Sequence, residues 1–279
     1  ALSDLAHGEN DVRRAAIANN LGRVLKRLGD AQQARAYFEN ALALDQAKYG
    51  DDHPHVAEVI NNYGTVLHES GDFQTALQQF QWALEICRTH YGSESSKVAT
   101  ITNNLGYALA HSGDLDRALD HLNEALRTAQ LVCGPRHPLI ATIRANLGIA
   151  LRLKGRPDAA QAELERALSV GESTLGPEHV EVARCLAHLG SLYQDRGELE
   201  SARESFERAL RIEERTFGEA HLLLIGHLNN LGRCLKLLNE VDASAACYER
   251  SAAILRNSRL QQEAGSAGAE DNSPEFLFS

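Results

Sequence analysis

The chain has 279 residues and carries 28 basic and 38 acidic side chains, which gives a formal net charge of −10. This acidic balance argues against non-specific attachment to nucleic acid or to an anionic membrane as the main role. The five cysteines form no close pairs in the sequence, which predicts small core residues in a reducing, cytoplasmic compartment, and no apolar run of about 18 residues is present to span a membrane.

One unit occurs six times along the chain at intervals of 42 residues. A glycine preceded by Asn-Asn-Leu or a close variant marks each copy, and these glycines are Gly22, Gly64, Gly106, Gly148, Gly190 and Gly232. A fixed period of roughly 20 to 50 residues is typical of small helical or strand units stacked into an array. The copies are expected at 9–50, 51–92, 93–134, 135–176, 177–218 and 219–257.

Two short segments lie outside the six copies. His7-Gly8 aligns with Tyr49-Gly50 one period later, so residues 1–8 are expected to be the remnant of a preceding helix. Residues 258–279 are rich in small and acidic residues, which predicts a flexible C-terminal tail.

Each copy is predicted to form two helices. In the copy at 51–92, Pro54 suits a first helical turn, and apolar residues spaced by three and four continue almost to Gly71. Gly71 is expected to end this helix in a left-handed conformation, a place that Asn239 takes in the last copy. Asp72 can then cap a second helix. The predicted fold is all-α, an α-solenoid of six antiparallel helix pairs.

The repeated glycine lies inside the first helix of each pair, where glycine costs about 1 kcal/mol relative to alanine. A small residue recurs in the second helix, at Ala34, Ala76, Ala118, Ala160, Ala202 and Ser244. The pattern therefore predicts that the two helices approach closely, with a small residue against a small residue.

This arrangement of residues resembles the tetratricopeptide repeat. The likeness rests on Leu-Gly in the first helix, on an apolar residue three positions later, and on the alternating small and large residues of the second helix. The 42-residue length, Asn-Asn-Leu-Gly and the pairs His53-Pro54 and His137-Pro138 resemble the kinesin-light-chain-like branch. The resemblance covers about residues 9–257 and implies a right-handed superhelix, a right-handed α-solenoid, whose first helices line a concave, protein-binding groove.

The resemblance also implies which side chains face that groove. Two positions before the repeated glycine the copies carry Asn20, Asn62, Asn104, Asn146, His188 and Asn230. Asparagine is a poor helix former, and its amide matches the donors and acceptors of an extended peptide. In the kinesin-light-chain family such a ladder holds peptide backbone. The alternative is that these amides bond only to neighbouring helices.

Neighbouring groove positions are mainly basic. They carry Arg23, Lys26, Arg152, Arg184, Arg233 and Lys236, and Tyr107 lies beside them. The opposing charges are Glu58, Glu69 and Asp195, so the groove is expected to be net basic and to attract an acidic partner. The alternative is that these basic side chains are simply solvated.

The sequence ends in an acidic and aromatic cluster, Glu275, Phe276, Leu277 and Phe278. Because such a cluster suits a basic groove, it is predicted to act as a pseudo-ligand, in cis or on a neighbouring chain. A disordered end and a cloning remnant are the alternatives.

No motif for catalysis or metal binding occurs in the sequence. The twelve histidines form no HExxH pattern and are interpreted as structural, and neither GxSxG nor a phosphate-binding loop is present. No enzymatic activity, cofactor or metal is therefore expected. The predicted function is a scaffold that binds an extended, acidic peptide of a protein partner. A sensor or oligomerisation arm of a larger signalling protein, such as a nucleotide-binding switch ATPase, is the second class, and nucleic-acid binding is a third, which the net charge disfavours.

Overall fold

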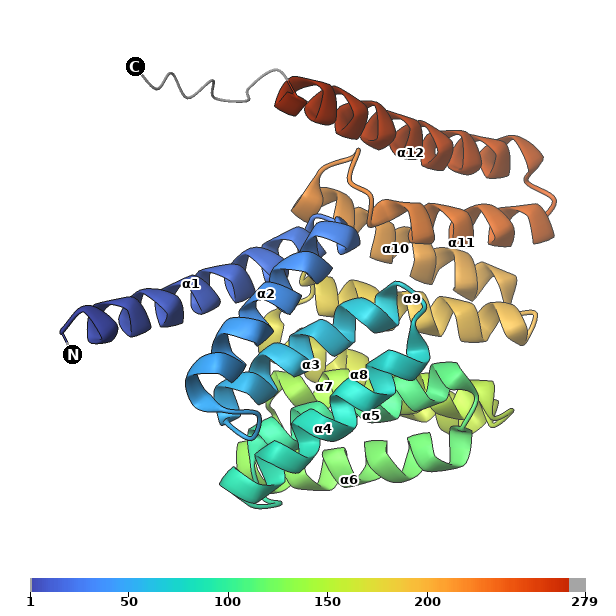
Figure 1. The fold of residues 1–279 in the computed structure, drawn as a ribbon. Coiled ribbons are helices and arrows are strands. Elements are labelled where there is room, and N and C mark those ends of the chain that lie inside the picture. Colours follow the sequence, from blue (N-terminus) through green and yellow to red (C-terminus); the bar gives the residue numbers. More distant parts are fainter. Residues whose placement is uncertain (1, 271–279) are drawn as a thin grey trace. The chain divides into compact units, whose positions relative to one another are not determined.

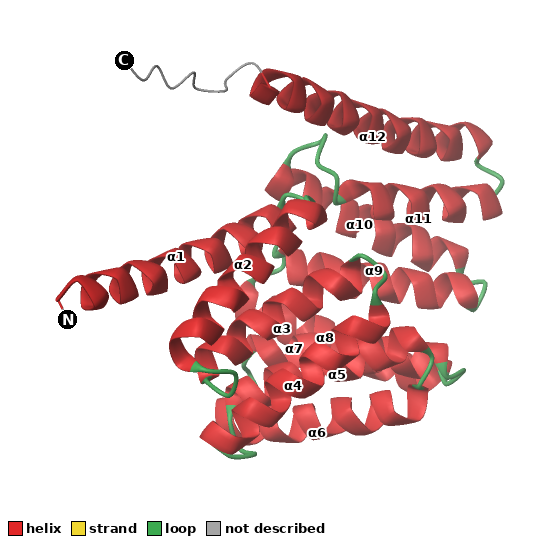
Figure 2. Ribbon diagram, in the orientation of Figure 1, coloured by secondary structure: helices red, strands yellow, loops and turns green. Residues whose placement is uncertain are grey.

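The computed structural model describes residues 2–270, with the side chains of residues 13–258 and of residue 260. This part of the chain is helical and contains no strand (Figure 2). Its twelve helices are α1 (Leu2–Arg27), α2 (Ala31–Tyr49), α3 (Pro54–Glu69), α4 (Phe73–Tyr91), α5 (Ser96–Ser112), α6 (Leu115–Cys133), α7 (Pro138–Leu153), α8 (Pro157–Leu175), α9 (Val180–Asp195), α10 (Leu199–Phe217), α11 (Leu224–Leu237) and α12 (Val241–Glu270). The all-α prediction is therefore confirmed.

The chain divides into two compact units, Ala1–His188 and Leu189–Ser279, and the division falls inside α9. In the first unit, α3 to α8 stack as successive antiparallel helix pairs (Figure 1). Each odd-numbered helix there packs on the even-numbered helix that follows it and on the one that precedes it. In the second unit, α10, α11 and α12 pack in the same consecutive order.

The predicted start and stop signals set the helix ends. Gly71 and Gly113 end their helices with φ of 85° and 91°, a left-handed region that side chains disfavour. Asn239 replaces this glycine in the last copy and adopts φ of 63°, which asparagine tolerates better than other residues with a side chain. The Asp72 carboxylate accepts a hydrogen bond from the Thr75 backbone N–H at 3.3 Å, which confirms it as an N-cap.

The repeated glycine permits close packing of each pair, but not in the way predicted. A Cβ at Gly148 would lie 2.5 Å from Leu164 Cγ and 3.2 Å from the Ala160 carbonyl oxygen. In the other copies the same position meets the large residue of the second helix, such as Phe80 against Gly64. The close approach is confirmed. The small residue does lie against the glycine, as the carbonyl oxygens of Ala118 and Ala160 show, but the large side chain of the second helix is closer still and fills the space that glycine leaves.

A histidine at the loop-to-helix position caps α3, α7 and α9, and His221 makes the same hydrogen bond just before α11, whose N-cap residue is Leu223. Nδ1 of each accepts the backbone N–H two residues later, at 3.2 Å for His53, His137 and His221 and at 3.1 Å for His179. A ring nitrogen thereby satisfies one of the N–H groups that a helix start leaves without an intrahelical partner. These four histidines are structural, as predicted.

Both ends of the described chain differ from the sequence prediction. α1 continues from Leu2 to Arg27 without interruption, so residues 2–8 are not the end of a separate helix. Gly8 lowers helix propensity by about 1 kcal/mol but does not by itself stop a helix. α12 likewise continues to Glu270, through much of the segment predicted to be a flexible tail. The first proline after Val241 is Pro274, so nothing in this stretch forces α12 to end earlier.

Three of the five cysteines belong to the core, as predicted. All five are free thiols, and Cys87, Cys185 and Cys234 are buried. Burial raises the pKa of the Cys185 thiol to about 11. None of the described helices combines the length and the apolar character needed to cross a membrane.

Candidate functional site

A cavity of about 170 Å³ lies among the odd-numbered helices of the first unit. Its lining comes from α1, α3, α5 and α7, from the part of α9 that belongs to this unit, and from one residue of α4. The lining residues are Lys26, Thr65, His68, Glu69, Phe80, Asn103, Asn104, Tyr107, Thr142, Asn146 and Arg184. The fold thus gathers five predicted groove residues, Lys26, Asn104, Tyr107, Asn146 and Arg184, around one space, which we call the groove cavity.

Asparagine side chains link successive odd-numbered helices of this unit. Nδ2 of Asn104 donates to Asn61 Oδ1 at 2.9 Å, and Nδ2 of Asn146 donates to Asn103 Oδ1 at 2.9 Å. Asn62 makes the same bond to Asn19 at 3.0 Å. We call these six side chains the amide ladder. One N–H of each donor amide therefore bonds to a neighbouring helix. Sequence analysis gave such bonding between helices as the alternative to peptide binding.

The acceptors of the ladder were missed by sequence reasoning. Each is the first asparagine of an Asn-Asn pair, one position before the predicted residue. The repeated Asn-Asn pair could have predicted these acceptors, because the second asparagine of one copy donates to the first asparagine of the copy before. Ala145 occupies the acceptor position of the fourth copy and has no side-chain oxygen, so the ladder ends at Asn146.

Asn146 leaves a polar atom unsatisfied inside the protein. Its side chain is almost fully buried, with 3% of the residue exposed. While Nδ2 bonds to Asn103, Oδ1 has no hydrogen-bond partner among the described residues. Asn146 also lines the groove cavity, so this unsatisfied acceptor belongs to a residue of the cavity wall.

The two cations of the groove cavity are partly neutralised. Lys26 Nζ lies 3.0 Å from Glu69 Oε1 and donates to Thr65 Oγ1 at 3.1 Å. Arg184 Nη2 lies 2.6 Å from Glu181 Oε2, whereas Arg184 Nε is buried without a partner among the described residues. The positive character of the cavity is therefore smaller than the sequence suggested, because Glu181 was not counted there.

A cluster of rings beside the cavity was also missed. The ring centroids of His68 and Tyr107 are 4.9 Å apart, and those of Tyr107 and His111 are 4.6 Å apart. Burial, reinforced by nearby His111 and Lys26, lowers the pKa of His68 to about 4. Burial and the charge of Arg152 also lower the pKa of His111. Both rings are therefore neutral at pH 7. His68 takes the same repeat position as Lys26, Arg152 and Lys236, four residues after the repeated glycine, so its position was predicted but its residue was not named.

The remaining predicted residues lie outside the groove cavity. In the first unit these are Asn20, Arg23, Asn62, Arg152 and His188, and in the second unit they are Asn230, Arg233 and Lys236. Arg23 Nη1 approaches Asn20 Oδ1 at 3.5 Å on an exposed surface. With the Gln194 amide turned so that its oxygen faces Arg233, that oxygen accepts from Arg233 Nε at 2.8 Å. Glu275, Phe276, Leu277 and Phe278 lie outside the described residues.

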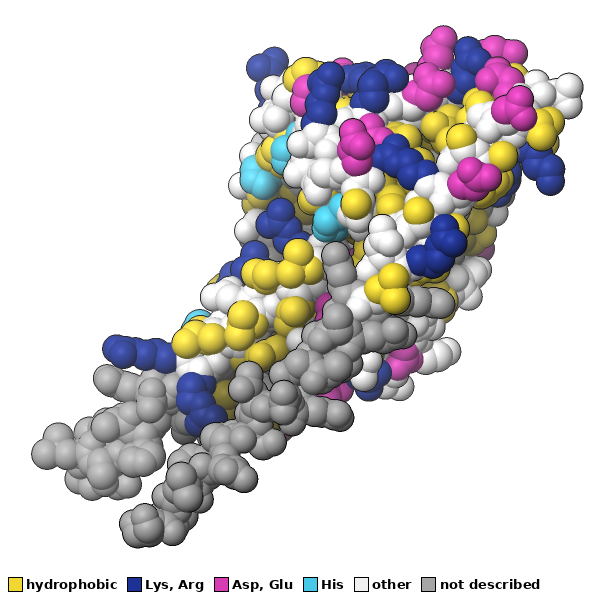
Figure 3. Space-filling view, turned by 90° about the horizontal axis from the view of Figure 1, so that it is seen from above, with side chains coloured by type: hydrophobic (Ala, Val, Ile, Leu, Met, Phe, Trp, Pro, Cys, Tyr) yellow, Lys and Arg dark blue, Asp and Glu magenta, His cyan; other side chains and the backbone are white. Residues whose placement is uncertain are grey.

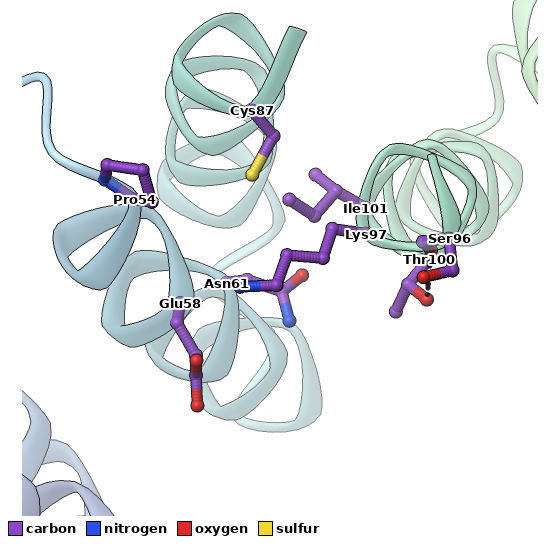
Figure 4. A pocket seen from close by; sticks show the side chains of 8 residues that line it. All are labelled: Pro54, Glu58, Asn61, Cys87, Ser96, Lys97, Thr100 and Ile101. Atoms are coloured by element: carbon purple, nitrogen blue, oxygen red, sulfur yellow. Dashed lines mark hydrogen bonds between the residues drawn. The ribbon is translucent and has the colours of Figure 1, made fainter. Parts of the chain in front are cut away.

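A second cavity, of about 200 Å³, lies between α3, α4 and α5 (Figure 4). The Lys97 side chain extends across it, and its Nζ donates to Tyr91 Oη at 3.2 Å. Asn61 lines this cavity, whereas Asn104, to which it is bonded, lines the groove cavity. One bond of the amide ladder thus links the linings of the two spaces. Of the predicted groove positions, the second cavity contains only the acidic Glu58.

Comparisons with known proteins identify the repeat. A family profile described as tetratricopeptide repeat matches residues 13–89, 97–173, 152–212 and 187–257. No curated protein is similar enough to count as a relative. Among solved structures, BtubC (BKLC) from P. vanneervenii is 20% identical, with a TM-score of 0.59 over 91% of this chain and 96% of that one.

Two further solved structures have the same fold. A putative kinesin light chain from Podosopora anserina with nearly identical TPR-like repeats is 21% identical, with a TM-score of 0.55 over 74% of this chain and 98% of that one. A Rap protein complexed with Competence and Sporulation Factor is 17% identical, with a TM-score of 0.67 over 91% of this chain and 76% of that one. At these identities the likeness concerns the fold alone, and it includes the kinesin-light-chain-like repeats that the sequence resembles. Together with the family match along most of its length, the helix pairs show that this chain belongs to the tetratricopeptide repeat family.

Proposed function

We propose that this protein is an interaction scaffold whose groove cavity holds part of an extended peptide from a protein partner. The observation that carries the proposal is the buried, unpartnered Oδ1 of Asn146. A buried polar atom without a hydrogen bond costs about 1–3 kcal/mol. A ligand that brings an N–H group to this atom would recover that free energy on binding.

The complementary group is also present in the cavity. Arg184 Nε is a buried donor without a partner among the described residues, and Arg184 and Asn146 line the same space. A peptide unit has one N–H donor and one carbonyl acceptor, so a single backbone segment can satisfy both side chains. The Rap protein structure, which is complexed with Competence and Sporulation Factor, supports the idea that this fold accommodates a bound factor.

We further propose that the bound segment carries acidic side chains. The cations nearest the cavity, Lys26 and Arg184, are paired with glutamates that are at least one-third exposed. Exposed ion pairs contribute about 0–1 kcal/mol, so a ligand carboxylate can compete with Glu69 for Lys26. Because the neighbouring histidine rings are neutral, this preference should persist at neutral pH. The proposed role is binding without catalysis.

Selection from a random peptide library, followed by calorimetry on synthetic peptides, tests the proposal. Arg184→Gln should weaken the selected peptides about tenfold, because a hydrogen bond to a charged group contributes about 1.5–3 kcal/mol. Asn146→Ala should weaken them similarly. The matched control is Asn123→Ala, which removes an exposed amide that bonds only to the Leu119 carbonyl oxygen on α6.

The affinities of the variants distinguish peptide binding in the groove cavity from binding elsewhere. Weaker binding to both groove variants and unchanged binding to Asn123→Ala would support the proposal. Equal affinity for all four proteins, or failure of the library to yield any peptide that binds, would contradict it. A fall in affinity with added salt is expected in addition, because the proposed ligand is acidic.

A further inference from the structure

An apolar stripe is exposed along α1 and the residue that follows it. Ile17, Leu21, Val24 and Leu28 are all exposed, and their spacing of four, three and four places them on one side of the helix. In Figure 3, hydrophobic side chains form a row beside Lys and Arg side chains toward the left, where α1 lies. We call these four residues the α1 face.

Three of these four positions are buried in the next copy, whereas Ser70, the equivalent of Leu28, is exposed. Val24 is 52% exposed, whereas Val66, which is 42 residues later, is 1% exposed. Val59 and Tyr63, the equivalents of Ile17 and Leu21, are buried as well. The exposure of Ile17, Leu21 and Val24 is therefore not a property of the repeat, because the equivalent residues of the next copy are covered.

Hydrogen bonds in other copies identify what covers these positions. Tyr63, equivalent to Leu21, donates its hydroxyl to Glu39 Oε1 on the preceding helix α2 at 2.7 Å. In the second unit, Cys234 is equivalent to Val24, and its Sγ donates to the Leu199 carbonyl oxygen on the preceding helix α10 at 3.3 Å. Each position thus faces the even-numbered helix of the copy before.

The equivalents of Ile17 and Leu28 also contact the even-numbered helix of the copy before. His227, equivalent to Ile17, has its Nε2 3.1 Å from Glu213 Oε1 on α10. Lys154, equivalent to Leu28, is ion-paired with Asp116 on α6. All four positions of the α1 face therefore have equivalents that contact a preceding even-numbered helix.

The last helix, α12, has residues at the positions that the even-numbered helices use in these contacts. Moving Leu199 and Glu213 forward by one period leads to Val241 and Leu255 of α12, which are 64% and 41% exposed. Moving Asp116 and Glu39 forward to the same copy leads to Asp242 and Glu249. We call Val241, Asp242, Glu249 and Leu255 the α12 face.

We infer that the α12 face of one copy of this chain packs on the α1 face of a second copy. In this joint Leu255 would meet Ile17 and Val241 would meet Val24, which pairs exposed apolar residues with each other. Asp242 would lie beside Leu28 and the adjoining Arg27. The contact between the two chains would be the same as the contact that links successive helix pairs within each unit.

Charge complementarity favours a second copy as the occupant. Between residues 13 and 28 the chain has five basic residues and no acidic one: Arg13, Arg14, Arg23, Lys26 and Arg27. The α12 face contributes Asp242 and Glu249. Opposite charges across an interface guide association and fix its register. Because the two faces differ, the contact is head to tail, so a third copy can add to the free end of a dimer.

Two charge-introducing variants test this inference by sedimentation equilibrium. Val24→Glu blocks the α1 face and Leu255→Glu blocks the α12 face, and because both residues are exposed, each variant should keep the helix content and thermal midpoint of the unmodified chain. Leu131→Glu is the matched control, since Leu131 is an exposed leucine on α6, outside both faces.

The unmodified chain and Leu131→Glu should both increase in average mass over roughly a 100-fold range of concentration. Each blocked variant alone should remain monomeric, and an equimolar mixture of the two should form dimers and nothing larger, since one intact face of each kind remains. A monomeric unmodified chain would overturn the inference. Self-association by either blocked variant alone, or a mixture that stays monomeric while the unmodified chain associates, would also overturn it.

Discussion

Replacing Gly148 with alanine should destabilise the first unit, although alanine is the better helix former. A Cβ at this position would lie 2.5 Å from Leu164 Cγ and 3.2 Å from the Ala160 carbonyl oxygen. The gain in helix propensity is about 1 kcal/mol. Overpacking a core costs about 1–3 kcal/mol, and Leu164, which is fully buried, has little room to move. The expected net loss is about 1 kcal/mol of unfolding free energy.

Gly226 provides a matched control on α11. Its Cβ position has no neighbouring atom within 4 Å, and its φ is not positive. Alanine there should stabilise the protein by about 0.4–1 kcal/mol. Urea unfolding followed by far-ultraviolet circular dichroism compares the two variants. If Gly148→Ala stabilised the protein as much as Gly226→Ala, the contact with Leu164 would not constrain this position and the reasoning would be refuted. In a Leu164→Ala background, the penalty at residue 148 should become smaller, with the contact to the Ala160 carbonyl oxygen remaining.

Three further predictions concern the amide ladder, the loop glycines and the buried histidine. Asn103→Ala should lower the free energy of unfolding by about 1–3 kcal/mol in urea, because Asn146 loses its buried acceptor; an unchanged midpoint would contradict a structural role for the ladder. At Gly113, where φ is 91°, asparagine should be tolerated better than alanine in thermal unfolding, as it is at Asn239; the reverse order would count against this. The folded pKa of His68, about 4, lies below its ordinary value of 6.5, so its contribution to stability is full above about pH 6.5 and is lost as the pH falls toward 4. His68→Gln should flatten the pH dependence of the urea midpoint over that range, and an unaltered slope would show that the histidine does not contribute.

The fold could be predicted from the sequence because the residues that start, end and orient each helix act locally and recur in every copy. Proline at a helix start, glycine or asparagine at a left-handed stop and apolar spacing of three and four each act within one helix or one turn. Six copies in the same register remove the ambiguity of any single pattern. The ends were harder to predict, since the glycines near them lower helix propensity without fixing where α1 begins or α12 stops.

The site could be predicted only in part, because some of its contacts depend on residues that occur in a single copy. The repeated positions predicted that Asn104, Asn146 and Arg184 lie on one side of the helix array, and these residues line one cavity. Repetition could not reveal that Glu181 pairs with Arg184, because that contact depends on a residue particular to one copy. It also could not distinguish an amide that faces a ligand from one that bonds to the next helix, since both occur at the same register position.

Hydrogen–deuterium exchange of the chain with and without a selected acidic peptide tests the proposed groove most directly. Occupation of the groove cavity should slow exchange in α5 and α7, which carry Asn104 and Asn146, and leave the outward-facing parts of α6 and α8 unchanged. Protection confined to the even-numbered helices, or a bound peptide that protects no odd-numbered helix, would place the binding surface elsewhere and contradict the account.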